Sequence, residues 1–285
     1  MATVPAPTPQ PTFPIRAAFY YPWFPEAWNQ LGINPYTKYH PTLGFYASGD
    51  DQVRRSHLHA LEYAKFDAGI YSWWGQGHST DQRFAGMLAV TNAAHSPIKW
   101  APYYEEESLG DPSSAKLAND LAYIKSRYAS DPAYLRVGGR PVIFAFSTGS
   151  DGCGMVDRWK AANAGNDFYV VLKVFSGYRN CASQPASWHQ YAPAKATDRQ
   201  AGYSYAISPG FNKANESSAR LGRDLARYQQ NVRDMVASAE PWQLVTTFNE
   251  WGEGTAVESA SQWASASGQG AYLDALHSNG SATGP

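Results

Sequence analysis

Short apolar runs recur along the whole chain, and stretches of mixed polarity long enough for a helix separate most of them. Several of these runs are apolar at consecutive positions, which is typical of strands that are buried on both faces. Strands that alternate with helices predict a parallel sheet, and eight of them predict an α/β fold, a single closed (β/α)8 TIM barrel. We interpret as strands the residues 17–23, 69–74, 99–105, 142–146, 169–175, 188–192, 203–209 and 245–249.

Two of the intervening stretches carry clear helix signals. Residues 50–66 open with Asp50 and Asp51, and the helix dipole favours negative charge at this end. Residues 217–239 place apolar side chains on one stripe with a period of 3.6 residues. The barrel pattern is weakest at the sixth run, which is short and is followed by a connection too short for a full helix.

The length of 285 residues suits one such barrel, and we expect a single catalytic domain over residues 15–277. Residues 1–14 are rich in Pro and Thr, which predicts a disordered, extended leader, and the Gly/Ser-rich residues 278–285 predict a flexible tail. The leader has no apolar signal core. A mature secreted protein without its signal peptide would begin this way, and so would a cytosolic protein with a loose end.

Charge and hydropathy exclude several classes of partner. The formal net charge is -1 and only 16% of residues are charged, so the chain lacks the basic excess that binding to nucleic acid requires. It also lacks an apolar run of about 18 residues, so no membrane span is expected. The histidines have no Asp or Cys at metal-ligand spacing and no phosphate-binding loop is present, so we expect no metal and no cofactor. We expect a monomer.

Aromatic and acidic residues gather where the predicted strands end. In a (β/α)8 barrel the active site lies at the C-terminal ends of the strands, and the flat apolar faces of aromatic rings suit sugar rings. The 10 Trp, 19 Tyr and 12 Phe therefore favour a carbohydrate ligand, although rings also fill barrel cores. The candidate substrate contacts are Tyr20, Tyr21, Trp23, Tyr46, Trp73, Trp74, Tyr104, Glu105, Glu106, His189, Asn249 and Trp251.

Two carboxylates follow the last predicted strand within the stretch Thr247-Phe248-Asn249-Glu250-Trp251-Gly252-Glu253-Gly254-Thr255. Gly252 and Gly254 allow tight turns, so both side chains can face one cleft. Glycoside cleavage requires one carboxyl that protonates the leaving oxygen and a second that acts as base or nucleophile. Glu250 and Glu253 are therefore the candidate catalytic residues, whereas a solvated turn with two acids is the structural alternative.

The motif Asn249-Glu250-Trp251-x-Glu253-Gly254-Thr255 resembles the signature of glycoside hydrolase family 99, the endo-α-mannosidase family. The opening Ala18-Phe19-Tyr20-Tyr21-Pro22-Trp23 is similar to the first strand of that group. The stretch Ile207-Ser208-Pro209-Gly210-Phe211, which precedes a long helix and then the motif, resembles its seventh and eighth strands. The similarity covers most of residues 15–260, and the terminal motif is its most specific part.

The resemblance implies a retaining endo-glycosidase. In that family the first Glu of the motif is thought to act as base on the 2-hydroxyl of the sugar, through an epoxide-like intermediate, and the second as general acid/base. Carried over by position, these roles fall to Glu250 and Glu253. The family usually has His between the Trp and the second Glu, whereas this chain has Gly252, which puts the substrate and the epoxide route in question. The long segment 24–49 is a further departure, and it is expected to shape a subsite.

Glu105, Glu106 and Glu107 are adjacent, and three adjacent carboxylates cannot all be buried and ionised, because like charges raise one another's pKa. We expect Glu105 or Glu106 to face the cleft as a binder of substrate hydroxyls. A charge cluster ahead of a helix at Ser113 is the second interpretation, and a nucleophile is the third.

Cys153 and Cys181 are the two cysteines of the chain. A disulfide between them would fit a secreted protein, and two buried thiols are an equal alternative. The sequence thus favours a secreted glycoside hydrolase acting on a mannose-containing or other cell-wall polysaccharide. Ordinary two-carboxylate chemistry on a different glycan and a non-catalytic carbohydrate-binding barrel remain the alternatives.

Overall fold

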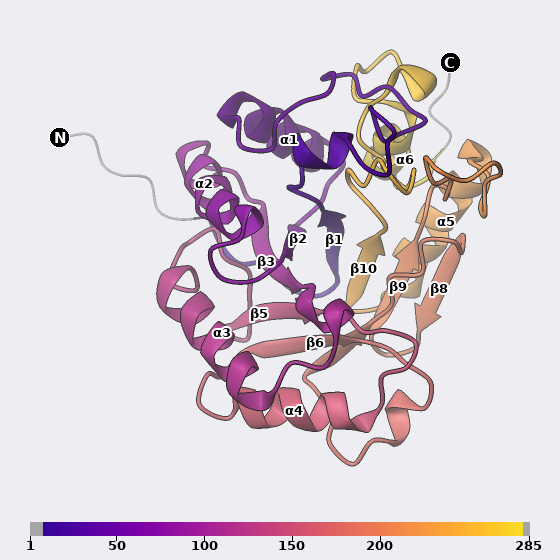
Figure 1. Ribbon diagram of the computed structural model, residues 1–285. Helices are drawn as coiled ribbons and strands as arrows, with labels where there is room; N and C mark the ends of the chain where they lie inside the picture. Colours follow the sequence, from indigo (N-terminus) through magenta and orange to yellow (C-terminus); the bar gives the residue numbers. More distant parts are fainter. Residues whose placement is uncertain (1–7, 282–285) are drawn as a thin grey trace.

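Eight parallel strands form a nearly closed barrel in the computed structural model, which describes residues 8–281 (Figure 1). They follow one another around the barrel, with β1 hydrogen-bonded between β2 and β10, while β7 and β9 lie at the two ends of the parallel series. The predicted single (β/α)8 barrel is confirmed. The eight strands are β1 (Ile15–Tyr20), β2 (Ala68–Trp73), β3 (Lys99–Tyr104), β5 (Arg140–Ala145), β6 (Tyr169–Lys173), β7 (Ser187–His189), β9 (Ser204–Ile207) and β10 (Trp242–Val245).

Two short antiparallel strands extend the sheet. The two-residue β4 (Arg136–Val137) pairs with β5, and β8 (Thr197–Gln200) pairs with β9. Strand β8 stands where a regular barrel has a helix, because the connection that follows β7 is too short for a helical crossover.

Within residues 8–281, six α-helices surround the barrel. Side chains cap several of them: Asp50 accepts from the Gln52 amide, Ser113 from the Lys116 amide and Asp224 from the Arg227 amide. The helices are α1 (Asp51–Tyr63), α2 (Ser79–Ala93), α3 (Ser114–Arg127), α4 (Cys153–Asn163), α5 (Leu225–Ser238) and α6 (Ala271–His277). Single 3-10 turns cover Glu26–Trp28, Glu106–Leu109, Tyr178–Asn180 and Ser261–Trp263.

Helix α5 and strand β10 differ from the sequence prediction. The helix begins at Leu225 rather than at residue 217, because Phe211 and Leu221 first pair as a β-bridge and Asp224 then caps the helix. Strand β10 occupies Trp242–Val245 rather than 245–249. Beyond Val245 the chain leaves the ladder, and the Thr247 amide donates to the carbonyl of Thr255 instead, so the motif residues form a loop.

Residues 8–14, which belong to the predicted leader, lie against the bottom of the barrel. The Lys99 ammonium donates to the Thr8 carbonyl at 2.9 Å, and the Arg136 amide donates to Gln10 Oε1 at 2.8 Å. The Phe13 ring meets Trp242 edge-on, with centroids 5.1 Å apart. This end of the barrel is therefore covered, and the open mouth lies at the opposite end. Residues 1–7 of the leader and 282–285 of the predicted tail lie outside the described residues.

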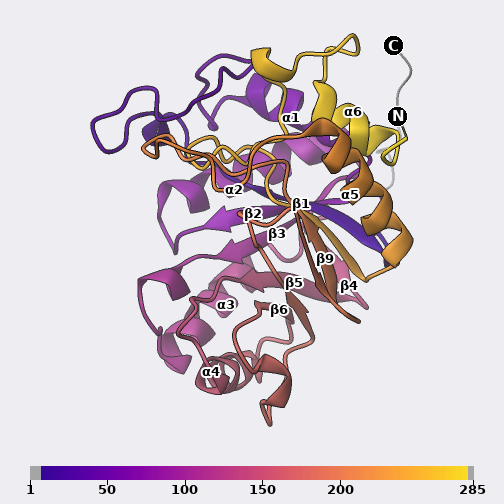
Figure 2. The same cartoon turned by 90° about the vertical axis from the view of Figure 1, so that its right-hand side faces the viewer.

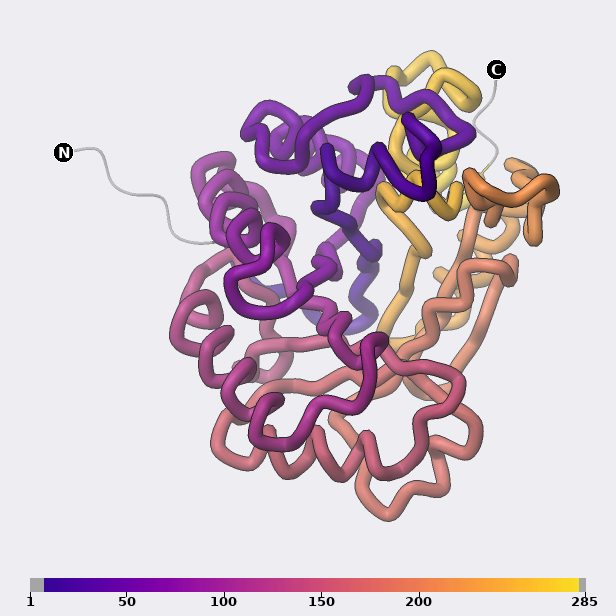
Figure 3. Tube along the Cα trace, in the orientation of Figure 1, coloured from indigo at the N-terminus to yellow at the C-terminus, as the bar shows by residue number. Residues whose placement is uncertain are grey.

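The segment 24–49, between β1 and α1, projects beyond the ends of β2 and β3 (Figure 2). It runs beside the segment that follows β10 (Figure 3), where the Thr42 amide donates to the Ser259 carbonyl at 2.9 Å and Pro41 bridges Ala260. These two segments together form one side of the barrel mouth. Among the helices of residues 8–281, none combines the length and the apolarity that crossing a bilayer demands.

Candidate functional site

A cavity of about 310 Å³ opens at the C-terminal mouth of the barrel. Loops that follow several different strands contribute to it, as expected for an active site in this fold. Its walls combine aromatic rings, three carboxylates and one ammonium group. The lining residues are Tyr21, Trp23, Gln30, Tyr36, Trp74, Tyr103, Glu105, Ser108, Phe146, Tyr191, Lys213, Glu250, Gly252 and Glu253.

The Glu250 carboxyl is held in a tight loop. The side chain of this residue is 6% exposed, its own amide donates to Thr247 Oγ1 at 2.9 Å, and its Oε2 accepts from the Glu253 amide. Burial raises the pKa of Glu250 to about 8, and the neighbouring Glu253 charge adds to the rise. The backbone therefore fixes where this carboxyl points, and burial favours its protonated form in the free protein.

Glu253 lies beside the same carboxyl but has a cation for a neighbour. Its Oε1 is 3.3 Å from Lys213 Nζ, and its side chain is 27% exposed. Burial raises the pKa of Glu253, and the Lys213 ammonium opposes that rise. A negative charge on Glu253 thus raises the pKa of Glu250, and the Lys213 ammonium favours the ionised form of Glu253.

Glu105 is the third carboxyl of the cavity. It follows β3, is buried, and accepts a hydrogen bond from Ser72 Oγ at 2.8 Å. Burial raises the pKa of Glu105 to about 8, and the charge of Glu253 contributes to the rise. Of the three adjacent glutamates, Glu105 is the one that faces the cleft. In its neutral form it can donate a hydrogen bond to a sugar hydroxyl.

Aromatic side chains line the cavity together with the carboxylates. The Trp23 indole donates to Ser72 Oγ at 3.0 Å, so the hydroxyl that binds Glu105 also fixes this ring. Trp23 and Trp74 are only partly buried, with ring centroids 6.3 Å apart. Such rings present flat apolar faces to the cavity, as sugar binding requires.

Tyr21 and Tyr191 meet in the floor of the cavity. The Tyr21 hydroxyl donates to the Tyr191 hydroxyl at 2.9 Å. Burial raises the pKa of Tyr191 well above its usual value, and the charges of Glu253 and Glu250 raise it further. Tyr191 therefore stays neutral beside the carboxylates, and its own proton is available to a carboxylate or to a sugar oxygen.

Six of the sequence candidates, Tyr21, Trp23, Trp74, Glu105, Glu250 and Glu253, lie together in this cavity, and the other eight do not line it. His189 is buried inside the barrel, where its Nε2 is 3.3 Å from the Tyr103 hydroxyl. Burial lowers the pKa of His189 to about 3, so the ring is neutral. The polar contact with the Tyr103 hydroxyl connects His189 to the cavity.

Trp73, Tyr104 and Glu106 point away from the cavity. The Trp73 indole donates to Asp81 at 2.9 Å, which anchors β2 on α2. The Tyr104 hydroxyl donates to Asp120 at 2.8 Å and also to Glu106, whose carboxylate pairs with Lys116. Side chains alternate along a strand, so the residue next to a cavity residue faces the surrounding helices.

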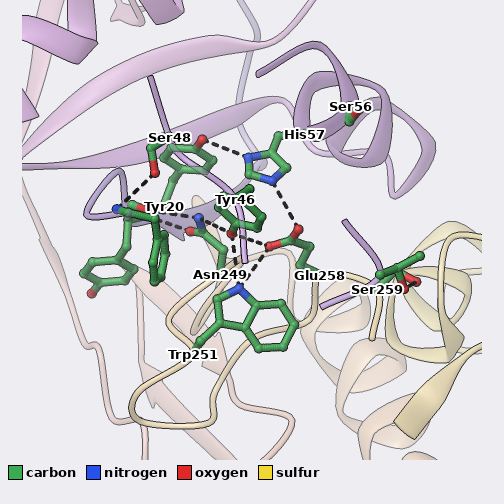
Figure 4. A network of polar contacts seen from close by, with 12 residues as sticks. Tyr20, Tyr46, Ser48, Ser56, His57, Asn249, Trp251, Glu258 and Ser259 are labelled. Carbon is green, nitrogen blue, oxygen red and sulfur yellow. Dashed lines mark hydrogen bonds and ion pairs between the residues drawn. The ribbon is translucent and has the colours of Figure 1, made fainter. Parts of the chain in front are cut away.

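Four further candidates, Tyr20, Tyr46, Asn249 and Trp251, are buried in one polar network at the base of the loop formed by residues 246–255 (Figure 4). The Asn249 amide group donates to the Tyr46 hydroxyl at 3.2 Å, and the Trp251 indole donates to the same hydroxyl at 3.1 Å. These residues support the loop rather than the ligand.

Sequence reasoning missed Gln30, Tyr36, Tyr103, Ser108, Phe146, Tyr191, Lys213 and Gly252 as lining residues. The position of Tyr103, Phe146 and Tyr191 at or near predicted strand ends could have identified them. Lys213 follows a strand through an irregular loop, which carries no comparable signal.

Tyr36 and Gly252 depend on each other. A Cβ atom at residue 252 would lie 2.8 Å from two carbons of the Tyr36 ring and 3.2 Å from Glu250 Oε1. Tyr36 comes from the 24–49 segment, and its hydroxyl donates to Asn215 Oδ1 at 3.1 Å. The missing side chain at Gly252 thus makes room for a ring that closes one side of the cavity.

One acidic group outside this cavity has the geometry to attract a cation. Within residues 8–281, the carboxylate oxygens of Glu107, Asp111 and Asp151 lie within 4.8 Å of one another. The Arg158 guanidinium already bonds both Glu107 and Asp111 at 3.0 Å. The group therefore has its own counter-ion, and a metal fits it poorly.

The fold is similar to solved glycoside hydrolase structures. The family 99 endo-α-mannosidase from Bacteroides thetaiotaomicron superposes with a TM-score of 0.74 at 17% identity, over 95% of this chain and 96% of that one. Its complex with bis-tris-propane gives 0.73 at 18% identity, with the same coverage. A glycoside hydrolase-like protein gives 0.67 at 15% identity, over 98% and 97% of the chains. The sequence matches no protein-family model and no curated protein.

Proposed function

We propose that this protein is a glycoside hydrolase that acts within a mannose-containing or other cell-wall polysaccharide. The observation that carries the proposal is the convergence of Glu250, Glu253 and Glu105 in a cavity walled by Trp23 and Trp74. Glycoside cleavage needs a protonated carboxyl and an ionised one side by side, and burial together with mutual repulsion supplies that state near neutral pH. A barrel that only binds sugar has no use for such a pair.

In this proposal Glu250 acts as base toward the sugar 2-hydroxyl, and Glu253 acts as general acid and then as base. Burial favours the protonated form of Glu250 in the free protein, so this role requires the carboxyl to lose its proton when the substrate binds. Once ionised, a carboxylate of raised pKa draws a proton from a hydroxyl more strongly. Glu253 is the more exposed of the two, and its position near the cavity mouth suits a group that must meet both leaving oxygen and water.

A second candidate keeps the same pair but uses ordinary two-carboxylate chemistry with exchanged roles. The Lys213 ammonium beside Glu253 favours it, since an ionised Glu253 could act as nucleophile while Glu250 carries the proton. A 2-deoxy-2-fluoro substrate distinguishes the two. This substrate has no 2-hydroxyl from which Glu250 could take a proton, so the first mechanism cannot act on it. In the second mechanism it accumulates as a covalent glycosyl-enzyme, which mass spectrometry detects.

The shape of the mouth supports attack within a chain rather than at its end. A cavity of about 390 Å³ shares Trp23, Gln30 and Trp74 with the catalytic cavity, and one of about 430 Å³ shares Ser108 with it. Two further hollows therefore border the catalytic cavity, one beside Trp23 and Trp74 and one beside Ser108. In this proposal they receive the sugar units that extend beyond the carboxylates.

Export of the protein is also proposed. Cys153 and Cys181 form a disulfide, with Cα atoms 5.3 Å apart, which decides between the two states that the sequence left open. Disulfides form and persist in oxidising compartments, where a polysaccharide of the cell wall would also be met.

The test is a screen of the purified protein against plant and microbial polysaccharides, α-mannans included, that measures new reducing ends. Glu250→Gln and Glu253→Gln run beside the wild type, with Glu106→Gln as the matched control, because Glu106 lies near the cavity residue Glu105 but pairs with Lys116 outside the cavity. We expect oligosaccharides from the wild type and the control, and none from the two variants. Binding without release by the wild type would contradict the proposal.

A further inference from the structure

A buried carboxylate lies behind the catalytic loop and belongs to none of the roles assigned above. Glu258 is 2% exposed, and its two oxygens accept from three different side chains. They are His57 Nε2 at 3.1 Å, the Tyr46 hydroxyl at 2.7 Å and the Trp251 indole at 3.2 Å (Figure 4). A buried carboxylate with this many partners is fixed in position, because losing any one of them leaves a polar group unpaired.

The hydrogen-bond directions follow from the donors. The Tyr20 hydroxyl lies 2.9 Å from His57 Nδ1 and can donate to it, and His57 Nε2 then carries the proton that Glu258 accepts. Helix α1, which carries His57, is thereby connected to the segment that follows β10. Tyr20 and His57 together fix the position of Glu258 from the side opposite the catalytic cavity.

Glu258 cannot meet a substrate directly. His57 and Glu258 border a separate cavity of about 220 Å³, whose other lining residues include Ser56 and Ser259 (Figure 4). Neither residue lines the catalytic cavity. Any effect of Glu258 on the reaction therefore passes through other side chains.

Two paths lead from Glu258 to the reacting groups. The first is the direct hydrogen bond from the Trp251 indole to Glu258, and Trp251 is the residue that follows Glu250 in the chain. The second passes through the Tyr46 hydroxyl to Asn249, on the other side of Glu250. Asn249 in turn holds the backbone of Tyr21, accepting from its amide at 2.7 Å and donating to its carbonyl at 2.9 Å.

We propose that Glu258 is a positioning residue for the catalytic site, which fixes Glu250 through Trp251 and Asn249 and fixes Tyr21 through the same amide. This inference rests on the proposed function. The residues on both sides of Glu250 are tied to one buried acceptor, so the acceptor sets the direction of that carboxyl. A displacement of about 1 Å at a reacting group is sufficient to lower a rate substantially.

The test compares two variants of buried glutamates. Glu258→Gln keeps the volume but removes the charge and one acceptor. Glu240→Gln is the matched control, because Glu240 is also buried and bonded, to Arg199 at 2.8 Å and to the Gly202 amide at 2.7 Å, but precedes β10 at the closed end of the barrel. We expect Glu258→Gln to lower kcat roughly 10- to 100-fold with KM within about 2-fold, and Glu240→Gln to leave kcat within about 2-fold.

A double-mutant cycle separates positioning from general loss of stability. Tyr46→Phe removes one of the donors to Glu258, and its combination with Glu258→Gln should lower kcat no further than Glu258→Gln alone. Equal kcat losses in Glu258→Gln and Glu240→Gln, or losses in the cycle that multiply, would overturn the positioning role while an active wild type upholds the proposed function. A wild type that hydrolyses no glycan would instead overturn the proposed function, and this inference with it.

Discussion

Glu253 is more exposed than Glu250 and has a different neighbour, and both differences affect which of the two holds a proton. Burial raises the pKa of both, and the adjacent charge of Glu253 raises that of Glu250 further. The Lys213 ammonium opposes the rise at both carboxyls, but it pairs directly with Glu253 alone. The sequence could identify the two carboxylates from the motif. It could not identify Lys213, because the ammonium reaches Glu253 from a loop with no periodic pattern.

Lys213→Met should raise the pKa of Glu253, because the ammonium that favours its ionised form is gone. If Glu253 is the general acid, the alkaline limb of the kcat/KM profile moves to higher pH. The measurement is kcat/KM against pH for wild type and variant. A shift of the acidic limb to higher pH would instead assign Glu253 the nucleophilic role, and an unchanged profile would contradict the importance of the ion pair.

Gly252→Ala should reduce activity on the order of 10-fold or more. The added Cβ would lie 2.8 Å from the Tyr36 ring and 3.2 Å from Glu250 Oε1, so either the ring or the carboxyl must move. Steady-state kinetics test this explanation by comparing Gly252→Ala with the double variant Gly252→Ala, Tyr36→Ala. If removal of the ring does not recover part of the activity lost in Gly252→Ala, the steric account is wrong.

At the scale of elements, the repeating pattern of strand and helix was predictable, and the ends of the elements were less so. The predicted run 245–249 misplaced the last strand, because Gln243 interrupts the apolar pattern of Trp242–Val245 while the loop beyond it carries the β-branched and aromatic residues Thr246, Thr247 and Phe248, which favour a strand. The predicted helix 217–239 began too early, since a β-bridge between Phe211 and Leu221 precedes the cap at Asp224. Long-range pairing of this kind leaves no local signal.

The disulfide joins the first turn of α4 to the 3-10 turn after β6 across a sequence separation of 28 residues. Closing a loop of this length in the unfolded chain corresponds to about 3.6 kcal/mol in the chain-entropy account. We expect the double variant Cys153→Ser, Cys181→Ser to lose about that much free energy of unfolding in urea titrations. Reduction of the wild type should give the same loss and leave the variant unchanged. A midpoint that does not respond to reduction would contradict a closed disulfide.

For the whole molecule, the buried carboxyls make stability depend on pH. The pKa of Glu105 is raised to about 8 in the folded state, so the folded protein retains a proton that the unfolded chain releases near its usual pKa. The stability that this proton contributes is therefore fully present below about pH 4.5, and it is lost as the pH rises towards 8. The barrel itself was predictable from the sequence. The dependence of stability on pH was not, because it depends on which carboxyls at the strand ends face inward.

Glu105→Gln should remove the contribution of that proton. We expect the variant to gain roughly 3 to 4 kcal/mol relative to wild type between pH 5 and pH 8, measured by urea unfolding at each pH. The control Glu106→Gln should follow the wild-type slope. If Glu105→Gln and wild type keep parallel slopes over this range, Glu105 is ionised in the folded protein and its assignment as a neutral hydrogen-bond donor is wrong.

The most direct test of the central claim compares leaving groups in Glu250→Gln and Glu253→Gln. A general acid is needed for a natural glycan but not for an activated aryl glycoside, whose leaving group departs without a proton. We predict that Glu253→Gln loses at least about 100-fold in kcat/KM on the glycan and far less on a dinitrophenyl glycoside of the same sugar. Glu250→Gln should lose activity on both substrates. Wild-type rates on the glycan in either variant would contradict the assignment of these two carboxylates as the catalytic pair.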